Sequence, residues 1–182
     1  MGMEAVYRRI RPERFTRMLV TAQAAPSYLL NIDLFYALEC SRAEWKAEAG
    51  EDAEFELGKH WHALHFLLTG NRSLEEPCPV PPPLGLVVLG GTTTPIATGY
   101  GAVRYLTPAE VQLVAKVLSE LTVTELARRF DPAAFNAAEI YGASRGAWDE
   151  ERLESVLELY PELVKFFADA AQAGDVVLLS LE

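Results

Sequence analysis

All three histidines of this chain lie within thirteen residues, from Gly58 to Gly70, together with Lys59 and Trp61. Neutral imidazoles bind metal ions and exchange protons near physiological pH. A lysine ammonium can hold an anion, and an indole ring can line a pocket with one edge in water. No other stretch is as dense in side chains capable of chemistry, so candidate sites are sought here first.

The apolar spacing predicts that this segment is a short helix. Gly58 is suited to its start and Gly70 to its end. One stripe about 100° wide, the width expected for a core-facing surface, collects five residues: Leu57, Trp61, Leu64, His65 and Leu68.

The same helical wheel separates the three histidines. His65 lies with the leucines, His62 lies on the flank of the stripe, and His60 lies on the other side. His62 and His65 are three residues apart and could reach one ion. Zinc, however, needs at least a third protein ligand, and the sequence has no fourth histidine and no nearby cysteine. The ligand count therefore argues against a metal site.

Two interpretations of His65 remain open. In one it is a general acid or base whose pKa is tuned by partial burial. In the other it is a structural histidine that is hydrogen-bonded within the core, as buried polar groups usually are. The catalytic interpretation requires a cleft that holds His65 with other polar or aromatic groups. The candidate ligand-binding residues are Lys59, Trp61, His65, Tyr100, Glu139 and Tyr141.

The position of Lys59 in the predicted helix is electrostatically unfavourable. In the first turn of the predicted helix its charge would oppose the helix dipole, which suggests a carboxylate partner or an anionic ligand. A surface lysine that tolerates a small penalty explains the same position without a ligand. Trp61 is likewise either a core-filling residue or the aromatic edge of a pocket.

The rest of the chain predicts an α+β fold with a small mixed or antiparallel sheet. About four strands, including both termini, pack with about six helices in a single domain spanning 1–182. Strands are expected at 1–10, 84–89, 102–106 and 175–181. Helices are expected at 12–24, within 27–47, and after the caps Thr107, Thr122, Asp131 and Asp149, the last with a break or kink at Pro161 and a stop at Gly174. Loops are expected at 48–56, 71–83 and 90–95.

Charge and cysteine usage narrow the possible partners. The net charge of −10 opposes sequence-independent binding to nucleic acid or to an anionic membrane, and it suits a basic protein partner or simple solubility. Cys40 and Cys78 are expected to be reduced thiols of a cytoplasmic protein, because the sequence opens with no signal peptide and has no membrane-spanning run. The glycines match neither a P-loop nor a dinucleotide motif, so no cofactor is expected.

A set of motifs spread along the chain resembles the YfbM-like family of bacterial proteins of unknown function. Two departures occur: Gly58 replaces the aspartate usual before the motif lysine, and Pro161 lies in the last helix. His60 and His62 are not required by the family pattern. The matching residues are Met1-Gly2-Met3, Lys59, Trp61, Leu64, His65, Leu67-Leu68-Thr69-Gly70, Gly90-Gly91, Tyr100-Gly101, the run 104–108, Ala137 to Tyr141, Trp148 and Ala173-Gly174-Asp175.

This resemblance implies an α+β fold and a bacterial cytosolic location, and it implies no reaction. Two functional hypotheses follow from the sequence. The first is a non-enzymatic binding or interaction protein with an acidic surface. The alternative is a small-molecule-binding protein or enzyme that uses His65 as acid or base in a cleft. The absence of a recognisable catalytic set favours the first.

Overall fold

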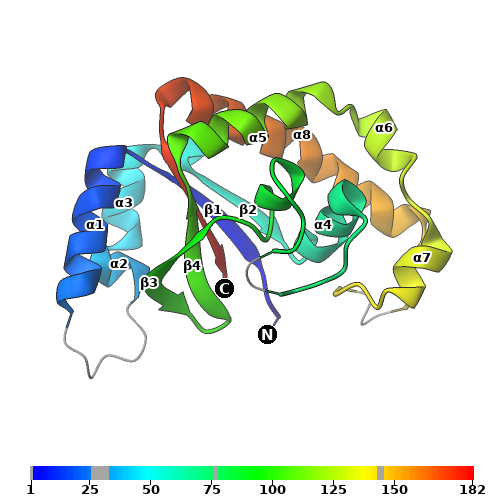
Figure 1. Cartoon of the computed structure of the whole chain (residues 1–182), viewed down its shortest axis with the longest axis horizontal. Coiled ribbons are helices and arrows are strands. Elements are labelled where there is room, and N and C mark those ends of the chain that lie inside the picture. The colour runs from blue at the N-terminus through cyan, green and yellow to red at the C-terminus, as the bar shows by residue number, and fades with distance from the viewer. Residues whose placement is uncertain (1, 26–32, 76–77, 143–145) are drawn as a thin grey trace.

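A five-stranded antiparallel sheet with strand order β2-β1-β5-β4-β3 forms the centre of the computed structural model (Figure 1). The structure describes residues 2–25, 33–75, 78–142 and 146–182. The first and last strands of the chain are neighbours within the sheet, so the described ends of the chain lie close together. The strands are β1 (Ala5–Ile10), β2 (Glu54–Gly58), β3 (Thr92–Thr98), β4 (Gly101–Leu106) and β5 (Val176–Leu181).

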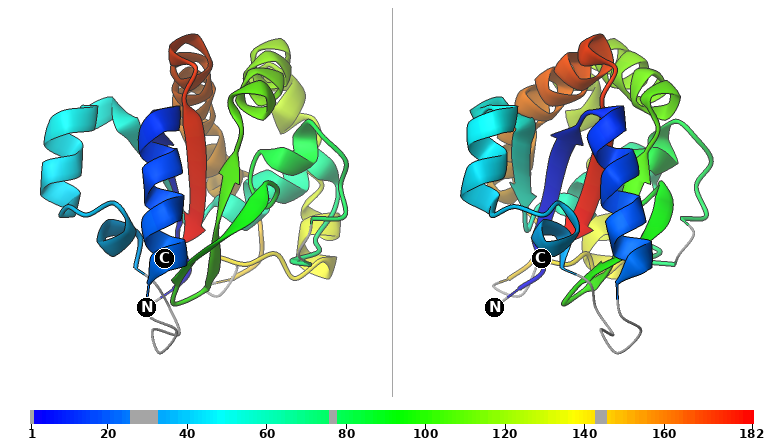
Figure 2. Two further views of the ribbon diagram at one scale, coloured as in Figure 1. Left: turned by 60° about the vertical axis from the view of Figure 1, so that its left-hand side comes forward. Right: turned by 90° about the vertical axis from the view of Figure 1, so that its left-hand side faces the viewer.

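Helices cover both faces of the sheet (Figure 2). One face carries α1 (Pro12–Ala24), α2 (Leu34–Ala37) and α3 (Arg42–Ala49), and the other carries α4 (Trp61–Thr69), α5 (Pro108–Glu120) and α8 (Glu150–Ala173). The short helices α6 (Val123–Ala127) and α7 (Pro132–Ala137) connect α5 to α8 around the end of α4. Two short 3-10 helices lie at Glu51–Ala53 and Leu84–Leu86. No helix in the described ranges is long and apolar enough to cross a bilayer.

β5 separates two hydrophobic cores. Val177 and Leu179 belong to the larger core with α4, α5 and α8, whereas Val176 and Leu178 belong to the smaller core under α1 to α3. This alternation follows from the two-residue period of a strand. The sequence prediction of a central strand buried on both faces at the end of the chain is confirmed.

Helices with strong local start and stop signals were predicted correctly. The helix expected at 12–24 is α1. Thr107 and Thr122 form complete capping boxes, and Gly174 ends α8 in the left-handed conformation with φ 69°. A break or kink was expected at Pro161; the break is absent, because α8 continues through this residue from Glu150 to Ala173. The helix expected within 27–47 is two shorter ones, α2 and α3, and residues 26–32 lie outside the described residues.

Three boundaries predicted from the sequence are wrong. The loop expected at 48–56 contains the end of α3 and the start of β2, and the loop expected at 90–95 contains the start of β3. β2 and β3 are the two edge strands of the sheet, so each buries few side chains and gives only a weak hydrophobic pattern in the sequence. Pro95 fits within β3 because an edge strand has one unpaired side, and the register with β4 is irregular there.

The strand expected at 84–89 is instead a 3-10 turn that covers the larger core. Its carbonyls are satisfied by side chains from the sheet rather than by a neighbouring strand. The Tyr7 hydroxyl donates to the Val87 carbonyl at 3.0 Å, and Arg104 Nη1 donates to the Leu89 carbonyl at 2.5 Å. An apolar run can therefore be buried here without pairing, because its polar backbone has other partners.

Candidate functional site

Helix α4 begins later than its sequence pattern predicts. Leu57 and Gly58 belong to β2, His60 is the N-cap residue, and the first helical residue is Trp61. Lys59 therefore precedes the helix, and the expected conflict between its charge and the helix dipole does not arise. Gly70 ends the helix in the left-handed conformation with φ 67°, as predicted.

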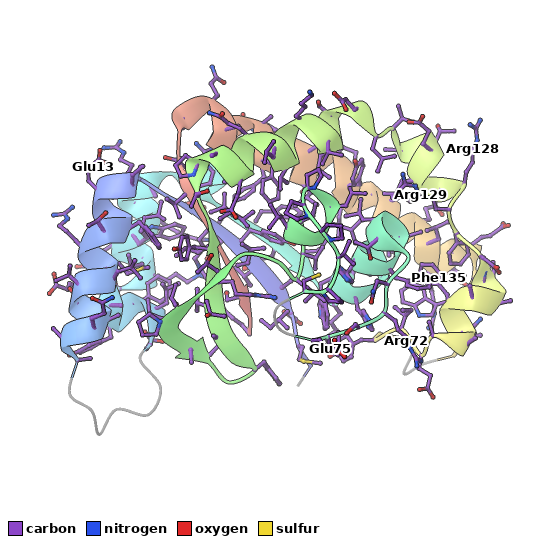
Figure 3. The ribbon with its side chains drawn as sticks, viewed as in Figure 1. Glu13, Arg72, Glu75, Arg128, Arg129 and Phe135 are labelled. Atoms are coloured by element: carbon purple, nitrogen blue, oxygen red, sulfur yellow. The ribbon has the colours of Figure 1, made fainter. Side chains whose placement is uncertain are left out.

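Helix α4 is buried on nearly all sides, which corrects the prediction of one core-facing stripe. Only Phe66 and Thr69 within it are partly exposed. The Phe66 ring packs against the edge of Phe135 from α7, with centroids 4.9 Å apart, and Arg129 donates to the Leu68 carbonyl at 3.1 Å (Figure 3). Residues 71–75 and 78–89 and the helices α6 and α7 thus cover the faces that a simple amphipathic helix would expose to water.

His62 is fully hydrogen-bonded inside this envelope. Its Nδ1 accepts from the backbone N–H of Tyr141 at 2.8 Å, so its Nε2 carries the proton and donates to the Arg72 carbonyl at 3.0 Å. Burial lowers the pKa of this imidazole, which keeps it neutral. His62 therefore connects α4 to the backbone of Arg72 and of Tyr141. Both of its nitrogens are used, so neither is left for a metal ion or a substrate.

His65 has the opposite environment. Its side chain is 0% exposed, and neither ring nitrogen has a hydrogen-bond partner among the described residues. Burial is the main cause that lowers the pKa of His65 to about 4; protonation of His62 would lower it as well, and so does the charge of Arg104. In this state the ring is neutral at physiological pH and has no bonded neighbour through which a proton would pass.

Three of the six candidate ligand-binding residues meet where β1 begins. We call this group, Lys59, Trp61 and Tyr141, the N-terminal corner. Met3 donates its backbone N–H to the Tyr141 hydroxyl at 2.7 Å, and the Trp61 indole donates to the Met3 carbonyl at 3.2 Å. The Trp61 and Tyr141 rings stack with centroids 5.5 Å apart. The two rings are therefore used to hold the start of the chain.

The contacts of Gly2 and Lys59 complete the N-terminal corner. A Cβ at Gly2 would lie 2.5 Å from the Tyr141 hydroxyl and 3.1 Å from Lys59 Cε, so no larger residue fits without displacement. The Lys59 ammonium lies 3.9 Å from a carboxylate oxygen of Glu4, which is the carboxylate partner that the sequence suggested as one possibility. These contacts explain why Gly2 and Met3 occur together with the distant Lys59, Trp61 and Tyr141.

The remaining two candidates lie on other elements. Tyr100 is exposed in the turn between β3 and β4, and Glu139 is exposed after α7 with φ 53°. Neither side chain makes a hydrogen bond or an ion pair within the described ranges. Of the six candidates, the structure thus brings Lys59, Trp61 and Tyr141 together, places His65 one helical turn beyond Trp61 in the core, and leaves Tyr100 and Glu139 at the surface.

A second polar cluster surrounds Glu54 on the other face of the sheet. The Glu54 carboxylate, only 2% exposed, contacts Arg8 at 2.7 Å, Arg42 at 2.5 Å and Lys46 at 2.9 Å. Burial opposes ionisation of Glu54, but the three cations outweigh it and lower its pKa to about 2. Glu182 binds the far side of the Arg8 guanidinium at 2.5 Å. Glu56 contacts Arg42 at 2.7 Å and supplies the third carboxylate. Three cations therefore face three carboxylates, so we interpret the cluster as structural.

A cleft of about 730 Å³ lies between the start of α1, the end of α3 and the turn from α8 into β5. The sequence predictions do not include it. We call it the arginine cleft, because its lining includes Arg9, Arg11, Arg14 and Arg17. Arg11 is the N-cap residue of α1, and Arg14 and Arg17 follow at intervals of three residues in its first turns. That spacing is the signal in the sequence that could have identified the cleft.

Together, the sheet, its two helical layers and the N-terminal corner define an α+β protein with both ends in the sheet. The sequence matches the family described as "Domain of unknown function (DUF1877)" over residues 1–180, so the chain belongs to that family. The solved structure of YfbM from Escherichia coli, a protein of unknown function, is similar with a TM-score of 0.69 and 21% identity, covering 99% of this chain and 100% of that one. That likeness shows a shared fold and confirms the YfbM-like resemblance. No protein with a curated description matches this chain.

Proposed function

We propose that this chain is a non-enzymatic binding protein that recognises a basic protein partner through an acidic face of α8. The observation that carries the proposal is a row of four glutamates spaced by three, four and four residues, so that they follow one side of the helix. All four are exposed, and none makes an ion pair with another described residue. The row consists of Glu151, Glu154, Glu158 and Glu162.

The glutamate row is held rigidly. The opposite side of α8 is buried in the larger core through Leu153, Val156 and Tyr160. The row covers eleven residue steps, or about 16 Å at the rise of an α-helix. Like charges one turn apart destabilise a helix by about 0.2–0.5 kcal/mol per pair. Binding of a basic partner would relieve this repulsion. Because the helix is already fixed, binding would not carry the entropic cost of ordering the segment that holds the carboxylates.

The environment of the best catalytic candidate supports a non-enzymatic role. General acid–base catalysis requires the ring to come within hydrogen-bond distance of the reacting group. His65 is enclosed by the core, and the polar atoms of Trp61 and Tyr141 are bonded to the backbone of Met3. The motif residues Trp61 and Tyr141 therefore have a sufficient explanation in folding.

The test of the proposal is partner capture with a matched pair of variants. The triple variant Glu154→Gln, Glu158→Gln, Glu162→Gln removes three charges from the row. The control removes three exposed glutamates elsewhere, at Glu51, Glu75 and Glu120. Captured proteins from the native host are purified, and their affinity for each variant is measured by calorimetry at two salt concentrations.

We expect a basic partner in stoichiometric amount, with salt-dependent affinity that falls about tenfold or more in the α8 variant and stays unchanged in the control. Repeated failure to capture a partner, or equal weakening by both variants, would contradict the proposal.

One observation favours the alternative of a small-molecule-binding protein or enzyme at His65. Neither of its ring nitrogens has a hydrogen-bond partner among the residues that the structure describes, as a buried polar ligand would require. A thermal-shift panel of metabolites and metal ions on the wild type and on His65→Leu separates the two hypotheses. This alternative requires a compound that raises the melting temperature of the wild type and not that of the variant.

A further inference from the structure

We propose that the arginine cleft is a binding site for a small organic anion that carries a carboxylate or phosphate group. This proposal is independent of the α8 face and involves a different ligand class. It rests on the shape of the cleft, on its concentration of guanidinium groups in an acidic protein, and on the way those groups are held.

The cleft has the size and lining of a small-molecule site. Its volume of about 730 Å³ falls within the range of ligand pockets. Trp45, Ile10 and Ala53 are buried residues at the base of its lining, and the arginines surround them. An anion with a small apolar body would match this combination, because the apolar lining contributes burial and the guanidinium groups fix the orientation.

The charge of the cleft differs in sign from that of the whole chain. Four arginines line it against three carboxylates, those of Glu13, Glu48 and Asp175, which leaves a formal charge of +1 in a protein of −10. The segment 8–17 alone carries five of the sixteen basic residues and one glutamate. A local positive charge inside an acidic protein raises the concentration of anions at that point only.

Two of the arginines are already oriented by carboxylates. Arg9 Nε donates to Asp175 at 3.1 Å, and Arg14 donates to Glu48 and to the Cys40 sulfur, the latter at 3.1 Å. Their side chains are only 17% and 18% exposed. Such guanidinium groups lose little freedom on binding, and their planar donor geometry fits carboxylate and phosphate oxygens.

The other two arginines leave their charge available. Arg11 and Arg17 are exposed, and their side chains make no ion pair or hydrogen bond with any other described residue. Glu48, the partner of Arg14, is itself 62% exposed, so an incoming anion can displace it. The first turn of α1 also has no side-chain cap, and its amides and dipole favour an anion at this end of the cleft.

The test measures the binding of two probe anions, citrate and inorganic phosphate, by calorimetry at one ionic strength. The double variant Arg11→Gln, Arg17→Gln removes the two available guanidinium groups. The control, Arg72→Gln with Arg128→Gln, makes the same change in net charge at the opposite end of the molecule, where Arg72 and Arg128 lie far from Glu13 at the start of α1 (Figure 3). Circular dichroism confirms that both variants fold.

We expect saturable binding of at least one probe with a Kd below about 1 mM. The affinity should fall about tenfold or more in the cleft variant and stay the same in the control. Binding of phosphate alone would assign the ligand to phosphate esters, and binding of citrate alone would assign it to carboxylates. Absence of saturable binding by either probe, or equal loss in the two double variants, would overturn the proposal.

Nuclear magnetic resonance locates the bound probe. Trp45 lines the cleft, whereas Trp61 and Trp148 lie in the larger core on the other side of the sheet. Titration should therefore shift the indole N–H signal of Trp45 and leave the other two unchanged. Shifts confined to Trp61 or Trp148 would place the anion elsewhere and contradict the assignment.

Discussion

Replacing His65 by leucine should stabilise the protein, although the residue belongs to the family motif. Leucine has nearly the same volume as histidine, and the site is lined by the larger core. Each buried polar group without a partner costs about 1–3 kcal/mol, and His65 has two such nitrogens within the described structure. Two such nitrogens would give about 2–6 kcal/mol, and the change of side-chain shape opposes this by up to about 1.5 kcal/mol. We therefore expect the free energy of unfolding of His65→Leu at pH 7.5 to exceed that of the wild type by at least about 0.5 kcal/mol.

The stabilisation should increase on acidification. The folded protein holds the pKa of His65 at about 4, below the 6.5 of an unfolded chain. Between these two values the unfolded state binds more protons, so the wild type loses stability as pH falls through this window. The loss linked to His65 is negligible at pH 7.5 and amounts to about 2 kcal/mol at pH 5.0. The leucine variant lacks this contribution, so its advantage should widen by that amount.

Urea denaturation of both proteins at pH 7.5 and 5.0 measures the two quantities. His62→Leu is the matched control, because it removes a neighbouring imidazole whose two nitrogens are bonded to Tyr141 and Arg72. It should lower the free energy of unfolding by about 2–4 kcal/mol by leaving two backbone groups unpaired. The reasoning is refuted if His65→Leu is no more stable than the wild type at pH 7.5, or if its advantage does not grow at pH 5.0.

Three further changes have defined outcomes. Gly2→Ala should cost about 1 kcal/mol by disturbing the bond from Met3 to Tyr141, with faster hydrogen exchange at the Met3 amide; unchanged exchange would speak against the N-terminal corner as described. Glu54→Gln should cost about 3–5 kcal/mol at pH 7 by leaving cations without their carboxylate. The wild type should lose that advantage as pH falls from 4.5 through about 2. If the free energies of unfolding of both proteins fall in parallel over this range, the prediction is wrong. Pro161→Ala should raise the free energy of unfolding by about 1–3 kcal/mol, because α8 would regain a backbone hydrogen bond; a lower melting temperature would contradict this.

The sequence predicted the elements whose signals are local. The capping boxes at Thr107 and Thr122 and the glycine stop at Gly174 act within four residues, and each lies where predicted. The apolar run of β5 was also sufficient to predict a central strand, because a central strand must be apolar on both faces. The α+β class follows from these elements alone.

The remaining features depend on residues far apart in the chain. The run 84–89 is as apolar as a strand, and only donors from Tyr7 and Arg104 make a turn possible there. His62 and His65 are equivalent by spacing, yet one is bonded to Tyr141, 79 residues away, and the other is unpartnered within the described part of the chain. The arginine cleft similarly needs Asp175 beside Arg9, which no helical wheel of α1 contains.

The position of β5 in the sheet has a consequence for synthesis on the ribosome. β1 and β2 form one ribbon and β3 and β4 another, and in the sheet order only β5 joins the two. β5 is also the last of the five described strands to leave the exit tunnel, so neither core can close until β5 has been synthesised. A chain truncated before Val176 should therefore remain two unjoined ribbons with exposed edges. A circular permutant that links the adjacent ends and opens elsewhere should retain the fold, since its joined β5–β1 pair would be available early.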